Sequence, residues 1–127
     1  MSCLFCDIDQ HHDQKILFEN NLVIYTQNEK YQGALKHSGV IVPVAHRETV
    51  FDLTQEEVIA TFEILKEVKS YLDLEHKPDG YNVGWNNGAV GGQHIFHAHM
   101  HVIPRFKQEP MAYKGIRAHL GSEANKW

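Results

Sequence analysis

Short apolar runs mark the N-terminal third of the chain. Two β-rich runs, Ile16–Glu19 and Leu22–Thr26, are separated by Asn20-Asn21. This pair is typical of a hairpin turn, because Asn tolerates a positive φ. A third apolar run, Val40–Val42, is closed by Pro43 and predicts a short buried strand. The mixed polar segment before it, residues 28–38, is expected to be a loop.

The apolar period changes after residue 53 and predicts a long helix. Thr54 and Glu57 match a capping box, a hydroxyl at the N-cap with a carboxylate three residues later. Pro78-Asp79-Gly80 stops the pattern, so we expect the helix to run to about Leu74. Its apolar positions are expected to form one face packed on the core: Val58, Ile59, Phe62, Leu65, Val68, Tyr71 and Leu72.

Two further strands are predicted after this helix. They cover Tyr81–Trp85 and Ile95–Ile103, and Pro104 bounds the second. Strands therefore come before and after one helix, with short links between them. This order favours antiparallel pairing and an α+β fold.

Composition limits the classes of protein to which the chain can belong. The 127 residues suffice for one domain, and the formal charge of −4 argues against a nonspecific nucleic-acid binder, which needs a basic face. The sequence has no apolar run of about 18 residues and no signal-peptide pattern at its start. We therefore expect a cytoplasmic protein without nucleic-acid or membrane partners. Its two cysteines are expected to stay reduced.

The ten histidines include three that alternate within one predicted strand. Side chains on a strand point to opposite faces in turn, so His97, His99 and His101 are expected to share a face. The intervening apolar residues would fill the core. Imidazoles packed this closely cannot all be charged, and such an arrangement suits catalysis or metal binding better than packing.

A glycine-rich loop, residues 86–93, leads into the histidine strand. Its sequence is Asn-Asn-Gly-Ala-Val-Gly-Gly-Gln. Gly91 and Gly92 can turn backbone N–H groups toward an anion, and the amide side chains add donors. Alone, the loop could simply form turns. Next to three histidines it favours phosphoryl or nucleotidyl transfer.

These residues resemble the histidine triad (HIT) family of nucleotide hydrolases and transferases. Residues 97–103 match the family pattern His-φ-His-φ-His-φ-φ, in which φ is apolar. Residues 86–93 resemble its nucleotide loop, and residues 40–46 resemble its "LVxPxxH" segment. Cys3-Leu4-Phe5-Cys6 resembles the N-terminal Cys pair of bacterial members.

The resemblance implies a fold and an assembly. The expected fold is a five-stranded antiparallel sheet with one long helix and a shorter one. The whole chain, residues 1–127, would form a single HIT domain with a core of about 1–105 and a tail of 106–127. Family members pair as homodimers in which two sheets join side by side, and we expect the same here.

The resemblance also implies a reaction and its catalytic residues. His99 is expected to attack an α-phosphate, and His97 and His101 are expected to flank it. The resulting nucleotidyl-histidine is resolved by water or another acceptor, without a catalytic cofactor. The substrate would be a nucleoside phosphoramidate or a dinucleoside polyphosphate, with a purine base. The alternatives are a nucleotide-binding sensor or scaffold with little turnover, and a metalloenzyme whose histidines hold a catalytic metal.

Matching positions imply a set of substrate-binding residues. His94 stands where many members carry Ser or Thr, and His37 is one residue out of register with the family's Gly-His. Asn28 falls at the position that binds ribose hydroxyls, which is more often acidic in bacterial relatives, so the adjacent Glu29 is the alternative. The expected set is Asn28, His37, Asn86, Gly92, Gln93 and His94.

The CxxC pair has the spacing of half a metal site. With the resemblance, Cys3, Cys6, His46 and His97 are expected to hold a structural zinc ion that pins the N-terminus to the sheet. The alternatives are a redox pair and two buried apolar thiols.

Overall fold

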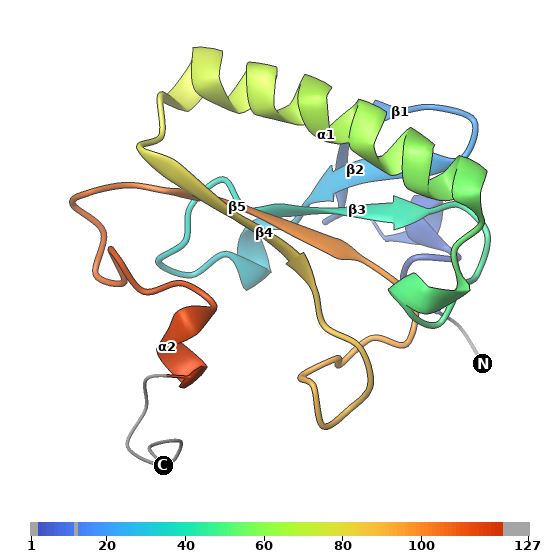
Figure 1. The fold of residues 1–127 in the computed structure, drawn as a ribbon. Coiled ribbons are helices and arrows are strands. Elements are labelled where there is room, and N and C mark those ends of the chain that lie inside the picture. The colour runs from blue at the N-terminus through green and yellow to red at the C-terminus, as the bar shows by residue number, and fades with distance from the viewer. Residues whose placement is uncertain (1–2, 12, 121–127) are drawn as a thin grey trace.

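The computed structural model describes residues 3–11 and 13–120 of the chain (Figure 1). Its described residues form one five-stranded sheet in the order β1-β2-β3-β5-β4, and all four pairings are antiparallel. The α+β prediction is confirmed. The strands are β1 (Lys15–Glu19), β2 (Val23–Gln27), β3 (Gly39–Pro43), β4 (Gly80–Trp85) and β5 (Met100–Arg105). The helices are α1 (Gln55–His76) and α2 (Arg117–Leu120), with 3-10 turns at Ile8–Gln10, Glu29–Tyr31 and Val50–Asp52.

The predicted hairpin joins β1 and β2, but its turn works differently from the expectation. The Asn20 side-chain oxygen accepts hydrogen bonds from the backbone N–H groups of Leu22 and Val23, both at 2.9 Å. Neither Asn20 nor Asn21 has a positive φ. The turn is therefore stabilised by a side-chain hydrogen bond and not by a left-handed residue.

The long helix α1 has the predicted start. Thr54 accepts a hydrogen bond from the Glu57 N–H at 3.1 Å, and Glu57 accepts one from the Thr54 N–H at 2.7 Å. The capping box is thus complete. The helix runs two residues beyond Leu74, to His76, and ends where Lys77 takes a φ of 50°.

The predicted core face of α1 is wrong at its N-terminal end. Val58, Ile59 and Phe62 are exposed, although they were expected in the core. The helix instead turns small residues toward the sheet at this end, and a row spaced four residues apart continues the contact. The buried row is Ala60 and Thr61, followed by Ile64, Val68 and Leu72. The helix therefore has two apolar stripes, one buried and one exposed.

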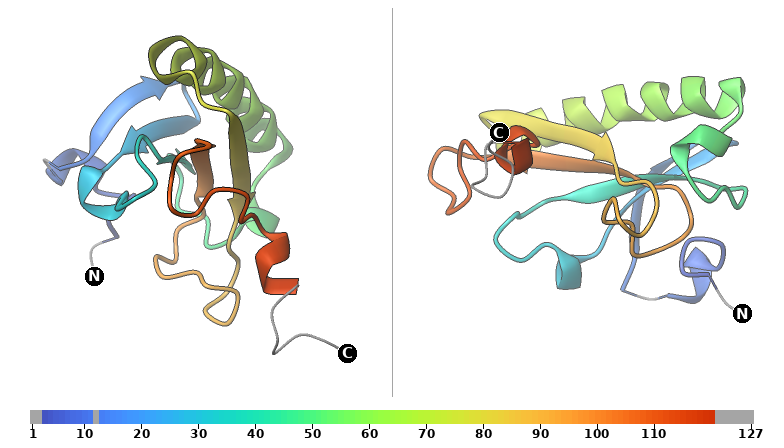
Figure 2. Two further views of the ribbon diagram at one scale, coloured as in Figure 1. Left: turned by 90° about the vertical axis from the view of Figure 1, so that its left-hand side faces the viewer. Right: turned by 60° about the horizontal axis from the view of Figure 1, so that its bottom comes forward.

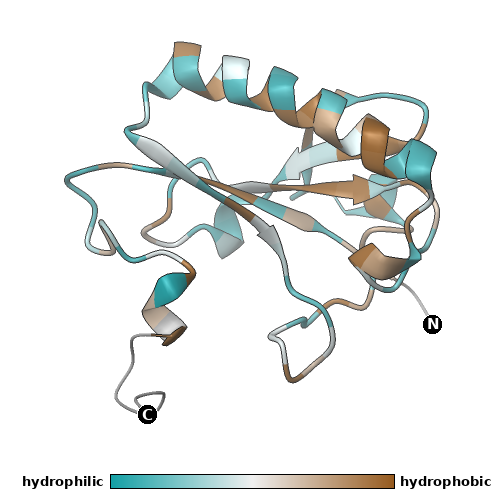
Figure 3. Cartoon of the chain, in the orientation of Figure 1, coloured by the Kyte–Doolittle hydropathy of each residue, from teal (hydrophilic) through white to brown (hydrophobic). Residues whose placement is uncertain are grey.

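The molecule has two layers, with α1 across one face of the sheet (Figures 1 and 2). The main core lies between them and includes Tyr25, Ile41, Ile64, Met100 and Val102. Strand β3, at the middle of the sheet, is apolar along its length (Figure 3). The N-terminal segment and the loop between β2 and β3 lie on the other face (Figure 2). Among the described residues, no helix combines the length and apolar character needed to cross a bilayer.

The predicted strand Ile95–Ile103 begins later than expected. Strand β5 starts at Met100, so His97 and His99 precede it. Pairing with both neighbouring strands ends at Met100, which lies opposite Ile41 of β3 and Trp85 of β4. The Pro43 carbonyl accepts from the His97 ring at 2.8 Å, and the Ala98 N–H donates to the Arg47 carbonyl at 2.6 Å. Side chains and a loop thus replace the ladder in this stretch.

The tail after β5 folds back on the sheet. The Arg105 side chain bonds Asn82, the carbonyls of Met111 and Lys114, and the Glu109 carboxylate. The short helix α2 supplies the second helix of the expected fold. The last seven residues of the predicted tail, 121–127, lie outside the described part of the chain.

Candidate active site

The three histidines of the HxHxH segment lie together at the start of β5. Their environments differ: the His97 side chain is fully buried and His99 is 8% exposed, whereas His101 is half-buried. The His99 and His101 rings meet edge to face, with 4.9 Å between their centroids. His101 lies between the core residues Met100 and Val102, so it faces away from α1.

His99 is held in one tautomer. Its Nδ1 lies 2.9 Å from the carbonyl oxygen of His97. A carbonyl can only accept, so Nδ1 carries the proton and Nε2 of the neutral ring does not. Burial lowers the pKa of His99, against the opposing effect of this hydrogen bond, and so favours the neutral ring. Nε2 is therefore the free, unprotonated nitrogen of His99.

His101 is also biased toward the neutral form. Burial lowers its pKa, and the neighbouring His99 lowers it further. The sequence argument that these adjacent imidazoles cannot all be charged agrees with this direction.

His97 faces a different group of side chains. Its Nε2 donates to the Pro43 carbonyl, which leaves Nδ1 unprotonated. Nδ1 lies 3.4 Å from the sulfur of Cys3 and 3.4 Å from that of Cys6. The Cys6 sulfur lies 3.1 Å from His46 Nδ1. All four candidate ligand atoms are within 4.8 Å of one another.

This group fits a tetrahedral zinc ion. Zn–S bonds of about 2.3 Å and Zn–N bonds of about 2.1 Å place neighbouring ligand atoms roughly 3.4–3.8 Å apart. The observed contacts of 3.1–3.4 Å are close to these separations. His97 Nε2 donates a hydrogen bond to the Pro43 carbonyl. A hydrogen bond from the nitrogen that does not bind the metal usually orients a ligating imidazole. The four predicted metal residues are thus brought together with a suitable donor set.

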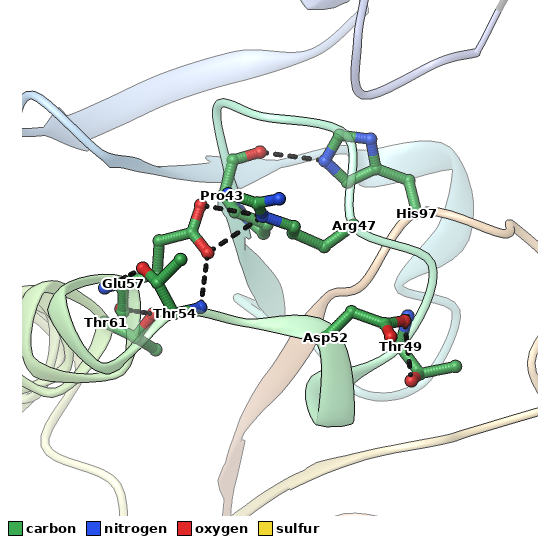
Figure 4. A network of polar contacts seen from close by, with 8 residues as sticks. All are labelled: Pro43, Arg47, Thr49, Asp52, Thr54, Glu57, Thr61 and His97. Carbon is green, nitrogen blue, oxygen red and sulfur yellow. Dashed lines mark hydrogen bonds and ion pairs between the residues drawn. The ribbon is translucent and has the colours of Figure 1, made fainter.

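A polar network connects the start of α1 to the histidine segment (Figure 4). The Glu57 carboxylate caps the helix and accepts from Arg47 Nε at 3.0 Å and 3.2 Å. The Arg47 carbonyl in turn accepts from the N–H of Ala98, between His97 and His99. The helix cap therefore helps to position the backbone that carries the histidines.

A pocket of about 510 Å³ opens at His99 and His101. It runs across the sheet face away from α1 and reaches the N-terminal segment and the loop before β3. Four of the predicted substrate-binding residues line it: Asn28, Asn86, Gly92 and His94. The Asn86 amide has no hydrogen-bond partner in the described ranges, so it is available to a ligand.

Glycines shape the loop at the histidine end of the pocket. A side chain at Gly91 would place its Cβ 2.5 Å from the Asn87 carbonyl oxygen, which excludes any larger residue without rearrangement. Gly92 has a φ of 96°, in the left-handed region. Glycine at these two positions therefore has a physical cause, a close backbone contact at Gly91 and a left-handed backbone at Gly92.

The pocket lining does not include Gln93 or His37. The Gln93 side chain is buried and bonds backbone groups at Gly88, Glu48 and Ile95, so it braces the loop. His37 has a φ of 70° and stacks on His76 with 3.6 Å between ring centroids. Its neighbour Ser38 lines the pocket instead.

Sequence reasoning missed a large part of the pocket wall. The alternation of β2 could have identified Thr26, and the CxxC pair could have drawn attention to the residues it encloses. The others depend on how loops fold over the sheet. The unpredicted lining residues are Leu4, Phe5, Gln14, Thr26, Tyr31, Gln32, Ser38, Gly39, Val40 and Ile95.

Comparison with known proteins identifies the family. The model of the HIT domain matches residues 10–108, well over half of the chain. The chain belongs to the HIT family. The resemblance carried by the histidine motif is thereby confirmed.

Relatives of this HIT protein include an uncharacterized protein and two proteins that are named as enzymes. An uncharacterized HIT-like protein of Methanocaldococcus jannaschii is 34% identical, over 83% of this chain and 80% of the relative. An adenylylsulfatase of Arabidopsis thaliana is 31% identical, over 98% of this chain and 64% of the relative. A bis(5'-adenosyl)-triphosphatase of Saccharomyces cerevisiae is 36% identical, over 61% of this chain and 42% of the relative.

Solved HIT structures share the fold. A HIT family protein from Bacillus anthracis covers 97% of this chain and 88% of its own, with a TM-score of 0.76 and 27% identity. A HIT protein from Bacillus subtilis covers 85% and 76%, with a TM-score of 0.76 and 29% identity. The family fold expected from the motif is therefore the fold observed.

Proposed function

We propose that this HIT protein is a nucleotidyl hydrolase or transferase that works through a covalent intermediate on His99. The observation that carries the proposal is the tautomer of His99, whose unprotonated Nε2 belongs to a ring at the end of a pocket. A nucleophile needs this lone pair, and the hydrogen bond to His97 supplies it without a separate base.

The proposed reaction has two steps. The Nε2 lone pair of His99 forms a bond to the α-phosphorus while the bond from phosphorus to the leaving group breaks. The leaving group takes its proton from His94 or His101, the two histidines that line the pocket together with His99. Water or another acceptor then attacks the phosphorus and gives its proton back to the histidine that protonated the leaving group, the phosphorus–nitrogen bond breaks, and neutral His99 with its proton on Nδ1 returns.

Binding of the phosphate is assigned to the glycine-rich loop. Asn86 and Gly92 lie in the lining beside the histidines, and Asn28 lies farther along the same pocket at the expected ribose position. Gln93 acts indirectly in this account, because its side chain holds the loop. Positioning and charge stabilisation of this kind provide most of the catalysis in phosphoryl transfer.

The CxxC group is proposed to hold structural zinc through Cys3, Cys6, His46 and His97. Bound zinc would fix the N-terminal segment and supply no catalytic chemistry. The consequence for the site is steric: Leu4 and Phe5 lie between the two cysteines and form part of the pocket wall. A reducing cytoplasm would keep both thiols available as ligands.

A homodimer is proposed from two open surfaces. Strand β4 is at the edge of the sheet, and it pairs on one side only within the described residues. Ile59 and Phe62 on α1 are each about half exposed, and Val83 on β4 is 37% exposed. An exposed strand edge and exposed apolar side chains are features that association covers.

The experiment compares release of AMP by the wild-type protein and by His99→Ala. Substrates are an adenosine phosphoramidate and a diadenosine polyphosphate, each with and without a chelator, and His11→Ala is a control outside the pocket lining. We expect His99→Ala to lose activity by at least about a thousandfold. Activity in His99→Ala equal to that of the control would overturn the proposal, as would binding of AMP by a wild-type protein without turnover.

A further inference from the structure

The far end of the pocket contains an unexpected polar pair. Thr26 on β2 is 1% exposed, and its hydroxyl donates to Gln14 Oε1 at 2.9 Å. Both residues line the pocket. A valine would fit the same buried strand position without needing a partner, so the hydroxyl calls for an explanation.

The pair has hydrogen-bonding capacity left for a ligand. Thr26 is too buried to contact a ligand itself, but its hydroxyl holds the amide oxygen of the half-buried Gln14 in place, and this Oε1 keeps a second lone pair that can accept. The Gln14 amide nitrogen has two N–H donors and no hydrogen-bond partner in the part of the chain that the structure describes. A donor and an acceptor are therefore offered side by side.

The position of the pair matches that of a nucleobase. Thr26 pairs with Val40, and Val40 pairs with His101, so one row crosses three adjacent strands. With neighbouring strands about 4.8 Å apart, the Thr26 backbone lies roughly 10 Å from that of His101. This is comparable to the span from the 5'-phosphate to the base of an extended nucleotide. Asn28, the expected ribose ligand, lies on the same side of the pocket.

The walls around the pair suit a flat aromatic ring. Leu4, Phe5, Val40 and Ile95 are apolar lining residues, and Gln14 and Thr26 add polar groups to this lining. Apolar walls with a few placed polar groups are the usual form of a small-molecule site, in which the polar groups set orientation and specificity.

We propose, on the basis of the proposed nucleotide chemistry, that Gln14, whose amide is oriented by Thr26, binds the edge of the nucleobase and makes the pocket prefer adenine to guanine. Adenine carries a 6-amino donor beside a ring-nitrogen acceptor, the pattern that a glutamine amide pairs with. On the edge that carries N7, guanine shows two acceptors, and only the amide N–H finds a partner. On its other edge guanine shows its donor and acceptor in the reverse order, so it would have to shift to pair.

The test measures equilibrium binding and not turnover. Titration calorimetry gives dissociation constants for AMP, GMP and purine riboside 5'-monophosphate, which lacks the 6-substituent. The variants are Thr26→Val and Gln14→Met, with Gln10→Met as an exposed glutamine control outside the pocket lining. Thermal melts check that each variant is folded, and Gln14→Met keeps the test informative if Thr26→Val is not.

We expect the wild-type protein and the control to bind AMP about tenfold more tightly than the other two nucleotides. Both base-pocket variants should lose this preference while GMP affinity changes little. Equal wild-type affinities for the three nucleotides would overturn the base assignment alone, as would a preference that survives in a folded variant. A wild-type protein that binds none of the three nucleotides would overturn both the base assignment and the proposed function.

Discussion

Glu57 is buried at the start of α1, and replacing it with Gln tests how the helix cap supports the site. The amide oxygen of Gln can still accept from the Thr54 N–H, but the negative charge opposite Arg47 is lost. The Glu57 side chain is 3% exposed and that of Arg47 is 34% exposed. The substitution thus removes one charge from a half-shielded pair at nearly constant shape.

The magnitude follows from the hydrogen bonds that depend on the charge. Hydrogen bonds to charged groups contribute about 1.5–3 kcal/mol, and the partial exposure of Arg47 favours the lower half of that range. A loss of about 2 kcal/mol is therefore expected. With an unfolding entropy of about 2.1 cal/mol/K per residue, a chain of this length should melt roughly 7 °C lower.

Dependence on pH separates the charge from other effects of the substitution. Burial alone would raise the pKa of Glu57, but hydrogen bonds from Thr54 and Arg47 outweigh it and lower the pKa. A lowered folded-state pKa gives stability that is complete above the unfolded value of about 4.3 and is lost as the pH falls through the folded value. The stability difference between wild type and Glu57→Gln should therefore be full at pH 7 and shrink below about pH 4.

The assay is thermal and urea unfolding of both proteins from pH 3 to pH 8. Asp52→Asn is the matched control, since Asp52 caps the Val50–Asp52 turn through the same kind of box but is exposed and has no ion pair among the described residues. The reasoning is refuted if Asp52→Asn is as destabilising as Glu57→Gln, or if the Glu57→Gln difference does not change with pH.

Three further predictions follow from the metal group, the loop and the open surfaces. Purified protein should contain about one zinc per chain, and chelation or Cys6→Ser should lower both the melting temperature and AMP affinity; metal-free protein with unchanged melting would contradict this. Gly91→Ala should weaken nucleotide binding severalfold because its Cβ would strike Asn87, whereas Gly80→Ala, which has open space, should not; calorimetry compares them. In sedimentation at micromolar concentration, the wild-type protein should be a dimer and Phe62→Glu a monomer; a wild-type protein that sediments as a monomer would contradict the proposed homodimer.

Much of the fold could be predicted because local signals agreed with the tertiary structure. The capping box at Thr54 and Glu57 predicted the start of α1, and alternation in residues 97–103 separated the histidines from the core residues between them. The strand order, with β5 between β3 and β4, depends on contacts between distant segments. No single apolar run predicts this order, and the resemblance implied only that the sheet has five antiparallel strands.

The predictions that failed concern residues whose type is compatible with more than one environment in a folded protein. Apolar periodicity could not tell which of two stripes on α1 faces the sheet, since small residues at Ala60 and Thr61 permit the closer approach. Loop residues such as Gln14 and Leu4 reach the pocket only through the folding of their segments. Gln93 matched the family pattern, but whether its amide would face a ligand or the loop backbone was not encoded in its spacing.

The most direct test of the central claim is to trap the covalent intermediate on His99. Wild-type protein is mixed with a labelled adenosine phosphoramidate, denatured within one turnover, and analysed by intact mass and peptide mapping. The account predicts one adenylyl group per active chain, attached to the peptide that contains His99 and absent in His99→Ala. Rapid turnover by wild-type protein with no adenylylated peptide, or with the label on another residue, would contradict it.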